Sequence, residues 1–340
     1  MYSLFRPFLF RLDPETAHHL TLQLVRLAGV IPPARWLLQA TFSAPEKPRE
    51  VFGLKFKNPV GLAAGYDKDG IAMRGLAALG FGHLEIGTVT LRPQSGNLRP
   101  RVFRLVEDQA VINRMGFPGE GAAKVDRNLL KIVHQPRSTI IGLNLGKNKD
   151  TPLEEAAQDY IALMRPFSKV ADYLAINISS PNTVGLRRLQ GRDMLENLLS
   201  AIGKERQAIA LAGGKHRPIL VKLAPDLSED ELEDAVEVVL RTGMDGVIAT
   251  NTTLGREGLA SSNKIETGGL SGRPLRVRSE MVLAQVLKRL DGRLPVVSVG
   301  GIMCPEDAKR RLDMGAALVQ VYTGLVYAGP GLVQKIIRAV

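Results

Sequence analysis

Eight short apolar runs, rich in β-branched residues, recur along the chain from residue 60 onward. Each run has the length and composition of a buried strand, and most neighbouring runs are separated by apolar residues at helical spacing. The predicted strands are residues 60–64, 83–90, 139–145, 171–178, 218–224, 245–252, 295–300 and 317–323. The predicted helices are residues 69–79, 120–133, 152–168, 193–211, 228–242, 275–290, 305–314 and 330–340. This alternation predicts an α/β protein with a parallel sheet, and eight strands favour a closed (β/α)8 barrel over an open doubly wound sheet.

The first 45 residues carry a different pattern. Seven large apolar side chains fall within residues 2–12, together with two arginines. Asp13 is a suitable N-cap and Pro14 a suitable first helical residue, so a helix is predicted from there to the proline pair at 32–33. A second short helix follows around Trp36.

Two interpretations of this N-terminal segment stay open on composition alone. Short amphipathic helices beside an aromatic, lightly basic stretch suit a surface that enters the lipid interface, or a helical cap folded onto the main domain. In either case we predict a helical extension over residues 1–45 and a barrel domain over residues 46–340. The barrel domain would open with a linker and a small hairpin at residues 51–59.

Composition narrows the possible compartments and partners. The formal net charge of +11 over 340 residues is spread along the chain, which permits nucleic acid or anionic lipid as a partner. Cys304 is the only cysteine, so the chain has no internal disulfide or cysteine-based metal cluster, and a reducing cytoplasmic setting fits. No apolar run is long enough to span a bilayer, and a secretory signal is not expected.

Polar residues follow the carboxyl ends of the predicted strands. The clearest example is ADYLAINISSPN at 171–182, where an apolar run ends in amides and hydroxyls. A buried polar group costs free energy unless it is paired, and barrels build their active sites at these strand ends. The residues concerned are Ala64–Lys68, Gly87-Thr88, Asn144, Asn177–Ser180, Lys222, Thr250–Thr252, Gly300-Gly301 and Tyr322–Gly324. A polar turn explains any one of these ends, but all eight together predict a site at one mouth of the barrel.

The residue types at this mouth restrict the chemistry. Asp67 is the only carboxylate and there is no histidine, which disfavours a catalytic metal and the two-carboxylate mechanism of glycosidases. Amides, hydroxyls and lysines suit a planar ligand with many heteroatoms. Gly300-Gly301 before a helix start is compatible with a phosphate site, although the glycine pair alone indicates only a tight turn. A phosphate beside a flat ring describes flavin mononucleotide (FMN).

Longer motifs in the same segments carry a family resemblance. They are GLAAGYDKDG (61–70), RPRVFRLVEDQAVINRMGF (99–117), GLNLGKNKDTP (142–152), NISSPNTVGLRRLQG (177–191), VKLAPDLS (221–228), IATNTT (248–253), ETGGLSGRPL (266–275), SVGGI (298–302) and VQVYTGLVYAGP (319–330). On these motifs the whole chain resembles the membrane-associated, quinone-dependent class of dihydroorotate dehydrogenases. Soluble classes have a cysteine at the position of Ser180. The resemblance implies oxidation of (S)-dihydroorotate to orotate in pyrimidine (UMP) biosynthesis, with FMN as hydride acceptor and a membrane quinone as final electron acceptor.

The resemblance also implies a role for individual residues. Ser180 would be the catalytic base, with Thr183 and Phe117 as a proton-relay and ring-packing pair beside it. The implied substrate contacts are Lys68, Asn113, Arg114, Met115, Gly116, Phe117, Asn177, Asn182, Asn251 and Thr252. The implied FMN contacts are Ala64, Gly65, Tyr66, Asp67, Lys68, Thr88, Asn144, Asn177, Lys222, Thr250, Gly272, Gly301, Tyr322 and Thr323. The implied quinone-site residues are His18 and Arg104, and no metal is expected.

Elementary chemistry supports part of this assignment. A lysine at the flavin's N1–C2 edge, the position implied for Lys222, would stabilise the anionic reduced flavin. A serine is a poor base because its own pKa is far above neutrality, so Ser180 needs a relay, a partner or a low-dielectric site. Two residues depart from the family pattern. Tyr66 replaces the more common Leu or Phe, and Val184 replaces a proline in the expected lid over the substrate (residues 182–192), which gives the open lid more freedom.

In this class the extension forms a hydrophobic tunnel through which a quinone reaches the flavin. The resemblance therefore implies a monomer bound peripherally to the cytoplasmic face of the bacterial cell membrane, with no nucleic acid partner. An FMN-dependent tRNA dihydrouridine synthase is the alternative flavin barrel, and it requires a cysteine acid near the flavin, for which Cys304 is badly placed. A phosphate-binding isomerase without a redox cofactor and a non-enzymatic membrane scaffold are the alternatives from other classes.

Overall fold

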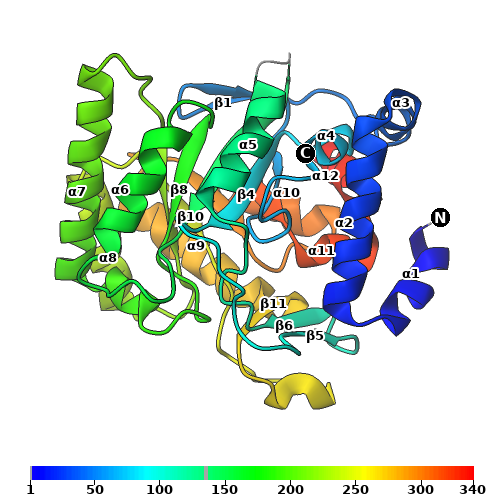
Figure 1. Cartoon of the computed structure of the whole chain (residues 1–340). Coiled ribbons are helices and arrows are strands. Elements are labelled where there is room, and N and C mark those ends of the chain that lie inside the picture. Colours follow the sequence, from blue (N-terminus) through cyan, green and yellow to red (C-terminus); the bar gives the residue numbers. More distant parts are fainter. Residues whose placement is uncertain (1, 134–136) are drawn as a thin grey trace.

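The computed structural model describes residues 2–133 and 137–340, and it confirms the barrel (Figure 1). Met1 and residues 134–136, which fall within the predicted extension and barrel domain, lie outside the described residues. Eight parallel strands close in the order β3-β4-β7-β8-β9-β10-β12-β13. They are β3 (Val60–Leu62), β4 (His83–Val89), β7 (Ile140–Leu145), β8 (Tyr173–Asn177), β9 (Ile219–Leu223), β10 (Gly246–Ala249), β12 (Val296–Val299) and β13 (Leu318–Val321). Each strand is shorter than predicted, mainly because residues counted at its ends belong to turns and loops.

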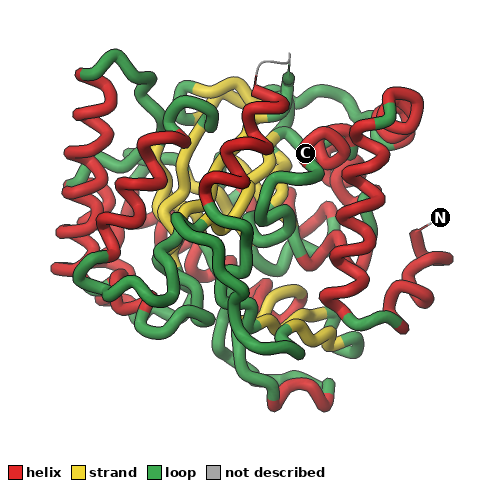
Figure 2. The backbone as a smooth tube through the Cα atoms, viewed as in Figure 1, coloured by secondary structure: helices red, strands yellow, loops and turns green. Residues whose placement is uncertain are grey.

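Helices surround the barrel, as Figure 2 shows, and bury their apolar faces against the strands. They are α4 (Met73–Ala78), α5 (Ala122–Val133), α6 (Ala156–Phe167), α7 (Arg192–Leu211), α8 (Glu229–Arg241), α9 (Arg276–Leu290), α10 (Pro305–Asp313) and α12 (Gly331–Ala339). The helix predicted from residue 69 begins only at Met73, because the chain after β3 first forms a loop at the barrel mouth. The hairpin of β1 (Arg49–Val51) and β2 (Leu54–Phe56) buries Phe56 against residues inside the barrel.

Several elements at the carboxyl ends of the strands were not predicted. An antiparallel sheet contains β5 (Val102–Leu105), β6 (Ala110–Asn113) and β11 (Gly269–Gly272), and it lies below the barrel in Figure 1. The segment expected to be a plain loop before α5 therefore contains a hairpin. The other unpredicted elements are helix α11 (Thr323–Ala328) and the short 3₁₀ helices η1 (Leu186–Gln190), η2 (Ser262–Ile265) and η3 (Arg273–Leu275).

The N-terminal extension contains three helices where two were predicted. They are α1 (Tyr2–Arg11), α2 (Pro14–Val30) and α3 (Pro32–Thr41), and they lie together along one edge of the molecule (Figure 1). The Asp13 carboxylate accepts the Thr16 N–H at 2.9 Å, which confirms the predicted N-cap. Eleven apolar side chains on this edge are 39–71% exposed: Leu4, Phe5, Phe8, Leu12, Leu20, Leu24, Leu27, Val30, Ile31, Trp36 and Leu37. Within the described residues, no helix combines the length and apolarity needed to cross a membrane.

Two glycines bring α2 into direct backbone contact with α4 of the barrel. A Cβ atom on Gly29 would lie 2.3 Å from the Gly75 nitrogen, and one on Gly75 would lie 2.0 Å from the Val25 carbonyl oxygen. Neither position can carry a side chain unless the helices separate. Glu15 adds a polar anchor, since its carboxylate pairs with Arg101 at 2.7 Å. The extension is therefore held on the barrel by shape as much as by apolar contact.

We expect Gly75→Ala to loosen this anchor. The added methyl group must push α2 away from α4, at a cost of about 1–3 kcal/mol of unfolding free energy typical of overpacking. Urea unfolding measures the loss, and limited trypsin digestion reports faster cleavage after Arg26. Gly331→Ala is the matched control, because its Cβ would meet open space. Equal stability and equal cleavage in both variants would contradict the role of this contact.

Candidate active site

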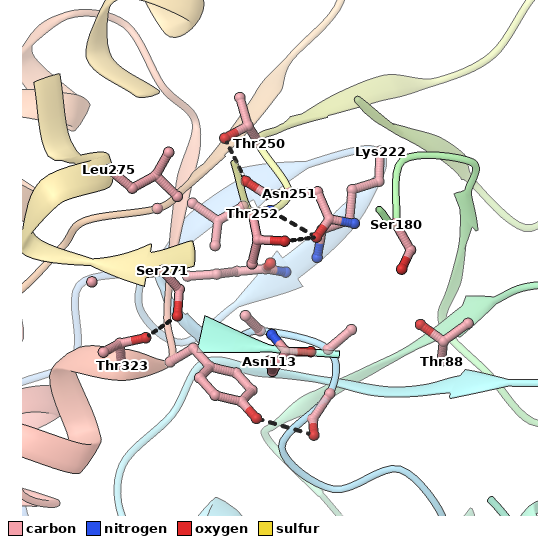
Figure 3. A pocket seen from close by; sticks show the side chains of 18 of the residues that line it. Thr88, Asn113, Ser180, Lys222, Thr250, Asn251, Thr252, Ser271, Leu275 and Thr323 are labelled. Atoms are coloured by element: carbon pink, nitrogen blue, oxygen red, sulfur yellow. Dashed lines mark hydrogen bonds between the residues drawn. The ribbon is translucent and has the colours of Figure 1, made fainter. Parts of the chain in front are cut away.

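One large cavity opens at the carboxyl ends of the barrel strands and encloses about 1010 Å³, its open mouth included. Strand ends, the loop after β6, β11 and the start of α11 all contribute to its walls, as Figure 3 shows for part of the lining. The predicted site residues that line it are Ala64, Gly65, Lys68, Thr88, Asn113, Met115, Gly116, Phe117, Asn177, Ser180, Asn182, Lys222, Thr250, Asn251, Thr252, Gly272, Gly301, Tyr322 and Thr323.

The amides of this cavity are locked to one another across neighbouring strands. Asn177 at the end of β8 donates from Nδ2 to Thr88 Oγ1 and to Asn144 Oδ1, both at 2.9 Å. The Thr88 hydroxyl is 2.6 Å from the same Asn144 oxygen. Asn251 Nδ2 donates to Ser179 Oγ at 3.0 Å. Because buried polar groups pair wherever they can, each amide has a fixed orientation before any ligand arrives.

Ser180 lies in this wall with only 5% of its surface exposed. Its Oγ accepts the backbone N–H of Asn182 at 3.2 Å. An N–H aimed at the oxygen favours the form of the hydroxyl that carries negative charge. Nearby in the chain, the buried Thr183 hydroxyl has no hydrogen-bond partner among the described residues. Thr183 does not line the main cavity, so a ligand there would not contact it directly. Its predicted role as a proton relay stays a prediction.

Two ammonium groups give the cavity a positive character. Within the described part of the chain, Lys68 and Lys222 are the only charged side chains in the lining. Burial lowers the pKa of both lysines, and nearby carboxylates oppose this, chiefly Glu15 for Lys68 and Glu85 for Lys222. Two cations without a carboxylate in the same lining favour an anionic ligand.

The predicted glycine turn is built as the sequence indicated. Gly300 and Gly301 have φ values of 115° and 71°, and a Cβ on Gly301 would lie 2.3 Å from the Arg276 Cα atom. Only glycine fits there. The fully buried Arg311 guanidinium supports the turn from behind, because it donates to the Gly300 carbonyl oxygen at 3.0 Å and to Ser279 Oγ at 2.8 Å. This leaves a rigid, glycine-lined wall of the kind that can admit a phosphate group.

The segment that follows Ser180 is fastened by Arg187. This guanidinium donates to the Ser179 carbonyl at 3.0 Å, to the Thr252 carbonyl at 2.8 Å and to Asp226 at 2.8 Å. Arg187 therefore connects the segments that follow β8, β9 and β10. Val184, one of the two departures from the family pattern, is 86% exposed at the outer side of this segment.

Four of the implied substrate and FMN contacts lie outside the cavity lining, for identifiable reasons. The buried Asp67 carboxylate accepts the N–H groups of Ile71 and Ala72 at 2.9 and 2.8 Å, so it caps the loop that leads to α4. Burial raises the pKa of Asp67 to about 6, although the two hydrogen bonds lower it in part. The Asn144 side chain is separated from the cavity by Thr88, to which it is hydrogen-bonded. The Arg114 guanidinium donates to the Glu266 carboxylate at 2.6 Å instead of reaching the cavity.

Tyr66, the fourth, stands between the barrel and the extension. Its ring packs edge-on against His18 of α2, with 4.9 Å between centroids, and against the cavity residue Tyr322 at 5.7 Å. Burial and the nearby Lys68 charge lower the pKa of His18 to about 3, so this imidazole is neutral near pH 7. Three aromatic rings thus connect the extension with the cavity wall.

The other predicted quinone-site residue, Arg104 on β5, contacts a different helix of the extension. It donates to the carbonyl oxygens of Phe10 at 2.9 Å and Leu9 at 3.3 Å, and its guanidinium lies 4.8 Å from the centroid of the Phe10 ring. The structure thus places both residues where extension and barrel meet, His18 at α2 and Arg104 at the end of α1.

Some lining residues were absent from the sequence-based site. They include Ser271, Leu275, Met303 and Gln320. Gln320 carried a usable signal, since it is a polar residue inside an otherwise apolar predicted strand. Ser271, whose Oγ lies 2.8 Å from Thr323 Oγ1, carried none, because β11 itself was not predicted.

Comparisons with known proteins agree with this geometry. A family model described as "Dihydroorotate dehydrogenase" matches residues 48–340. The chain is 50% identical over 343 residues to a protein of Halorhodospira halophila named "Dihydroorotate dehydrogenase (quinone)", with 100% of this chain and 97% of the relative covered. A protein of the same name from Acidithiobacillus ferrooxidans is 50% identical over 342 residues, covering 99% of this chain and 93% of the relative. The ferulenol complex of DHODH from Eimeria tenella is similar at a TM-score of 0.87 and 39% identity, covering 95% of this chain and 89% of that chain.

We expect Arg187→Gln to release the segment that carries the hydroxyls. Three hydrogen bonds from a charged group are lost, so amide hydrogen exchange over residues 179–191 should become about tenfold faster or more, while the barrel strands stay protected. Hydrogen–deuterium exchange mass spectrometry measures this. Arg188→Gln is the matched control, because that neighbouring side chain is exposed. Unchanged exchange in Arg187→Gln would show that other contacts hold the segment.

Proposed function

The chain belongs to the dihydroorotate dehydrogenase family, and from this membership we propose how its cavity oxidises dihydroorotate to orotate in pyrimidine biosynthesis, with a quinone as final electron acceptor. The observation that carries the proposal is the single cavity in which Ser180, four asparagines and two lysines converge. This reaction requires a hydroxyl that accepts a proton, amides that bind a pyrimidine ring and cations that bind anionic groups.

We propose FMN as the flavin. The cavity is large enough for a tricyclic ring and a pyrimidine together, and the wall made by Gly300 and Gly301 suits a phosphate. Gln320 supports a polar ligand, because this lining residue has a buried Oε1 atom without a hydrogen-bond partner among the described residues. When bound, the flavin supplies the acceptor for the hydride from the substrate.

In this proposal the asparagines hold the pyrimidine. Asn177, Asn251 and the pair Asn113–Asn182, whose side chains are 3.1 Å apart, present amide edges from different segments. Amides offer both donors and acceptors, as the imide edge of the substrate needs. Lys68 then pairs with the substrate carboxylate, which explains why an ammonium is kept in a lining that lacks carboxylates.

Ser180 accepts the proton from the substrate carbon in the proposed reaction. The Asn182 N–H stabilises the negative charge that develops on Ser180 Oγ, and the small exposed fraction of Ser180 keeps bulk water away. Phe117 covers the cavity beside Gly146, where a Cβ atom would lie 3.1 Å from the Phe117 ring. Thr183, whose buried hydroxyl has no hydrogen-bond partner among the described residues, is the proposed next carrier of this proton.

We propose that residues 1–45 form a quinone entrance on a membrane surface. Exposed apolar side chains cover α1–α3, and the contacts of His18 and Arg104 place polar groups where these helices meet the barrel. The aromatic series His18, Tyr66 and Tyr322 leads from this entrance to the cavity wall. A monomer bound to the cytoplasmic face of the cell membrane is the simplest arrangement, since one chain supplies both entrance and cavity.

The tRNA dihydrouridine synthase alternative is not favoured. Its chemistry needs a cysteine acid near the flavin, whereas Cys304 caps α10 and does not line the cavity. Burial, with hydrogen bonds to Glu306 and Asp307, raises the pKa of the Cys304 thiol to about 11.

We expect Ser180→Ala to separate flavin binding from proton removal. The variant should retain its flavin, while anaerobic flavin reduction by dihydroorotate should slow by roughly 10²-fold or more, the usual contribution of a positioned base. Stopped-flow absorbance of the bound flavin measures the rate. Ser200→Ala on α7, outside the cavity, is the control. A nearly normal rate would remove Ser180 from the mechanism, and a purified protein without any flavin would refute the proposed function.

We expect the double variant Trp36→Gln, Leu37→Gln to weaken membrane binding selectively. These side chains are 69% and 60% exposed on α3, and burying each in lipid contributes on the order of 1.5–3 kcal/mol. Vesicle co-sedimentation and turnover with a membrane-embedded quinone should both fall, while reduction of the flavin by dihydroorotate persists.

Leu211→Gln tests whether any exposed leucine would do the same. Leu211 is 83% exposed at the end of α7, on the side of the molecule away from α1–α3 (Figure 1). Equal vesicle binding by this control and the α3 double variant would contradict the assignment of the membrane surface.

A further inference from the structure

Glu85 is a fully buried carboxylate inside the barrel, directly beneath the cavity. It lies in the middle of β4 with none of its surface exposed. Its Oε1 accepts the Asn144 amide at 2.8 Å and lies 3.8 Å from Lys222 Nζ. Its Oε2 accepts the Gln320 amide at 2.8 Å and the Tyr173 hydroxyl at 3.1 Å. Four strands therefore direct hydrogen-bond donors or a cation at one carboxylate.

Donors surround the carboxyl group of Glu85. Three hydrogen-bond donors and one ammonium group favour negative charge at this position. The neighbouring titratable groups do not compete. Burial raises the pKa of Tyr173 far above neutrality, so its hydroxyl remains a donor, and burial lowers the pKa of His83 to about 3, so that imidazole is neutral.

Glu85 and Lys222 form an isolated ion pair. Among the residues of the eight barrel strands, no other Asp, Glu, Lys or Arg occurs. Removing two charges from water is costly, and their attraction offsets this cost only in part, so apolar side chains would fill the barrel interior equally well. Stability alone therefore does not account for the pair. Its upper member faces the cavity, since Lys222 is a lining residue and Glu85 is not.

We propose that Glu85 is a positioning residue that keeps Lys222 protonated and holds its ammonium group in the floor of the cavity, where it faces the flavin. The proposal rests on the flavin chemistry proposed above. Burial in the barrel favours the neutral amine, and the carboxylate opposes this. Glu85 thereby supplies, from the layer below the ligand, the condition under which Lys222 can stabilise negative charge on the reduced flavin.

The same carboxylate also orients Asn144. Because Asn144 donates its Nδ2 to Glu85, its Oδ1 must point up toward Thr88 and Asn177. These two residues line the cavity. A neutral glutamine at position 85 keeps the size of the side chain but removes its negative charge. The substitution thus tests the charge more than the shape.

The decisive measurement is the midpoint potential of the bound flavin as a function of pH in the holoenzyme. A protonated Lys222 stabilises the reduced flavin, so the potential falls more steeply with pH once this lysine loses its proton. In Glu85→Gln that inflection should move down by at least one pH unit, a tenfold or larger rise in the acid dissociation constant of Lys222. In Lys222→Gln and in the double variant it should be absent.

Two further variants separate charge from packing. Tyr173→Phe removes a neutral donor to the carboxylate and should leave the inflection near its wild-type pH. Glu85→Asp keeps the charge on a shorter side chain and should place the inflection between wild type and Glu85→Gln. If Glu85→Gln does not retain flavin, Glu85→Asp decides the question in the same way.

The outcomes distinguish the two proposals. A wild-type protein that binds no flavin refutes the proposed function. A flavoprotein in which Glu85→Gln and wild type give parallel curves between pH 5.5 and 9.5 refutes only the role of Glu85. An inflection that persists at the same pH in the Lys222→Gln background would show that another group titrates, and it would refute the role of Glu85 as well.

Discussion

Many polar side chains at the ends of the barrel strands are buried, and they need hydrogen-bond partners, which neighbouring strands supply. Closure of eight parallel strands imposes this constraint, because it brings all carboxyl ends to one rim. Asn177 forms hydrogen bonds with Thr88 and Asn144, and Asn144 forms a hydrogen bond with Glu85. The result is a network in which the orientation of a ligand-facing amide is set two strands away. A site of this kind needs little rearrangement when its ligand binds.

The barrel alone does not enclose the cavity. Strand ends fill the floor and the inner wall, whereas Asn113 and Gly272 reach the cavity from β6 and β11 of the added sheet. Arg187 then fastens the segment after β8 to those after β9 and β10. The Ser180 hydroxyl thus sits at the junction of a rigid barrel and a segment held by a few charged contacts. That division suits a site that must admit a substrate and then exclude water.

The sequence predicted the barrel because its signals are local. All eight strands and eight of the surrounding helices show periodicity within single segments, and the amides follow apolar runs directly. The added sheet escaped prediction because β11 is a four-residue, glycine-rich strand that pairs with a segment about 160 residues away. The helicity of residues 2–11 was missed since Pro7 and the dense aromatic composition argue against a helix. Glu85 and Gln320 are polar residues within apolar strands, but only the closed barrel shows that their side chains contact each other.

The position of Tyr66 connects the two parts of the molecule in a way that neither part alone would suggest. A Leu or Phe at this position would fill the space beside Tyr322, but it would bring no hydroxyl group to the contact with His18. The Tyr66 hydroxyl is buried, and burial raises its pKa to about 12, so it stays protonated and must be paired within the interface. A buried hydroxyl that needs a partner restricts how α2 can lie on the barrel. Together with the contact between Gly29 and Gly75, it fixes the extension in register with the cavity, as the proposed quinone entrance requires.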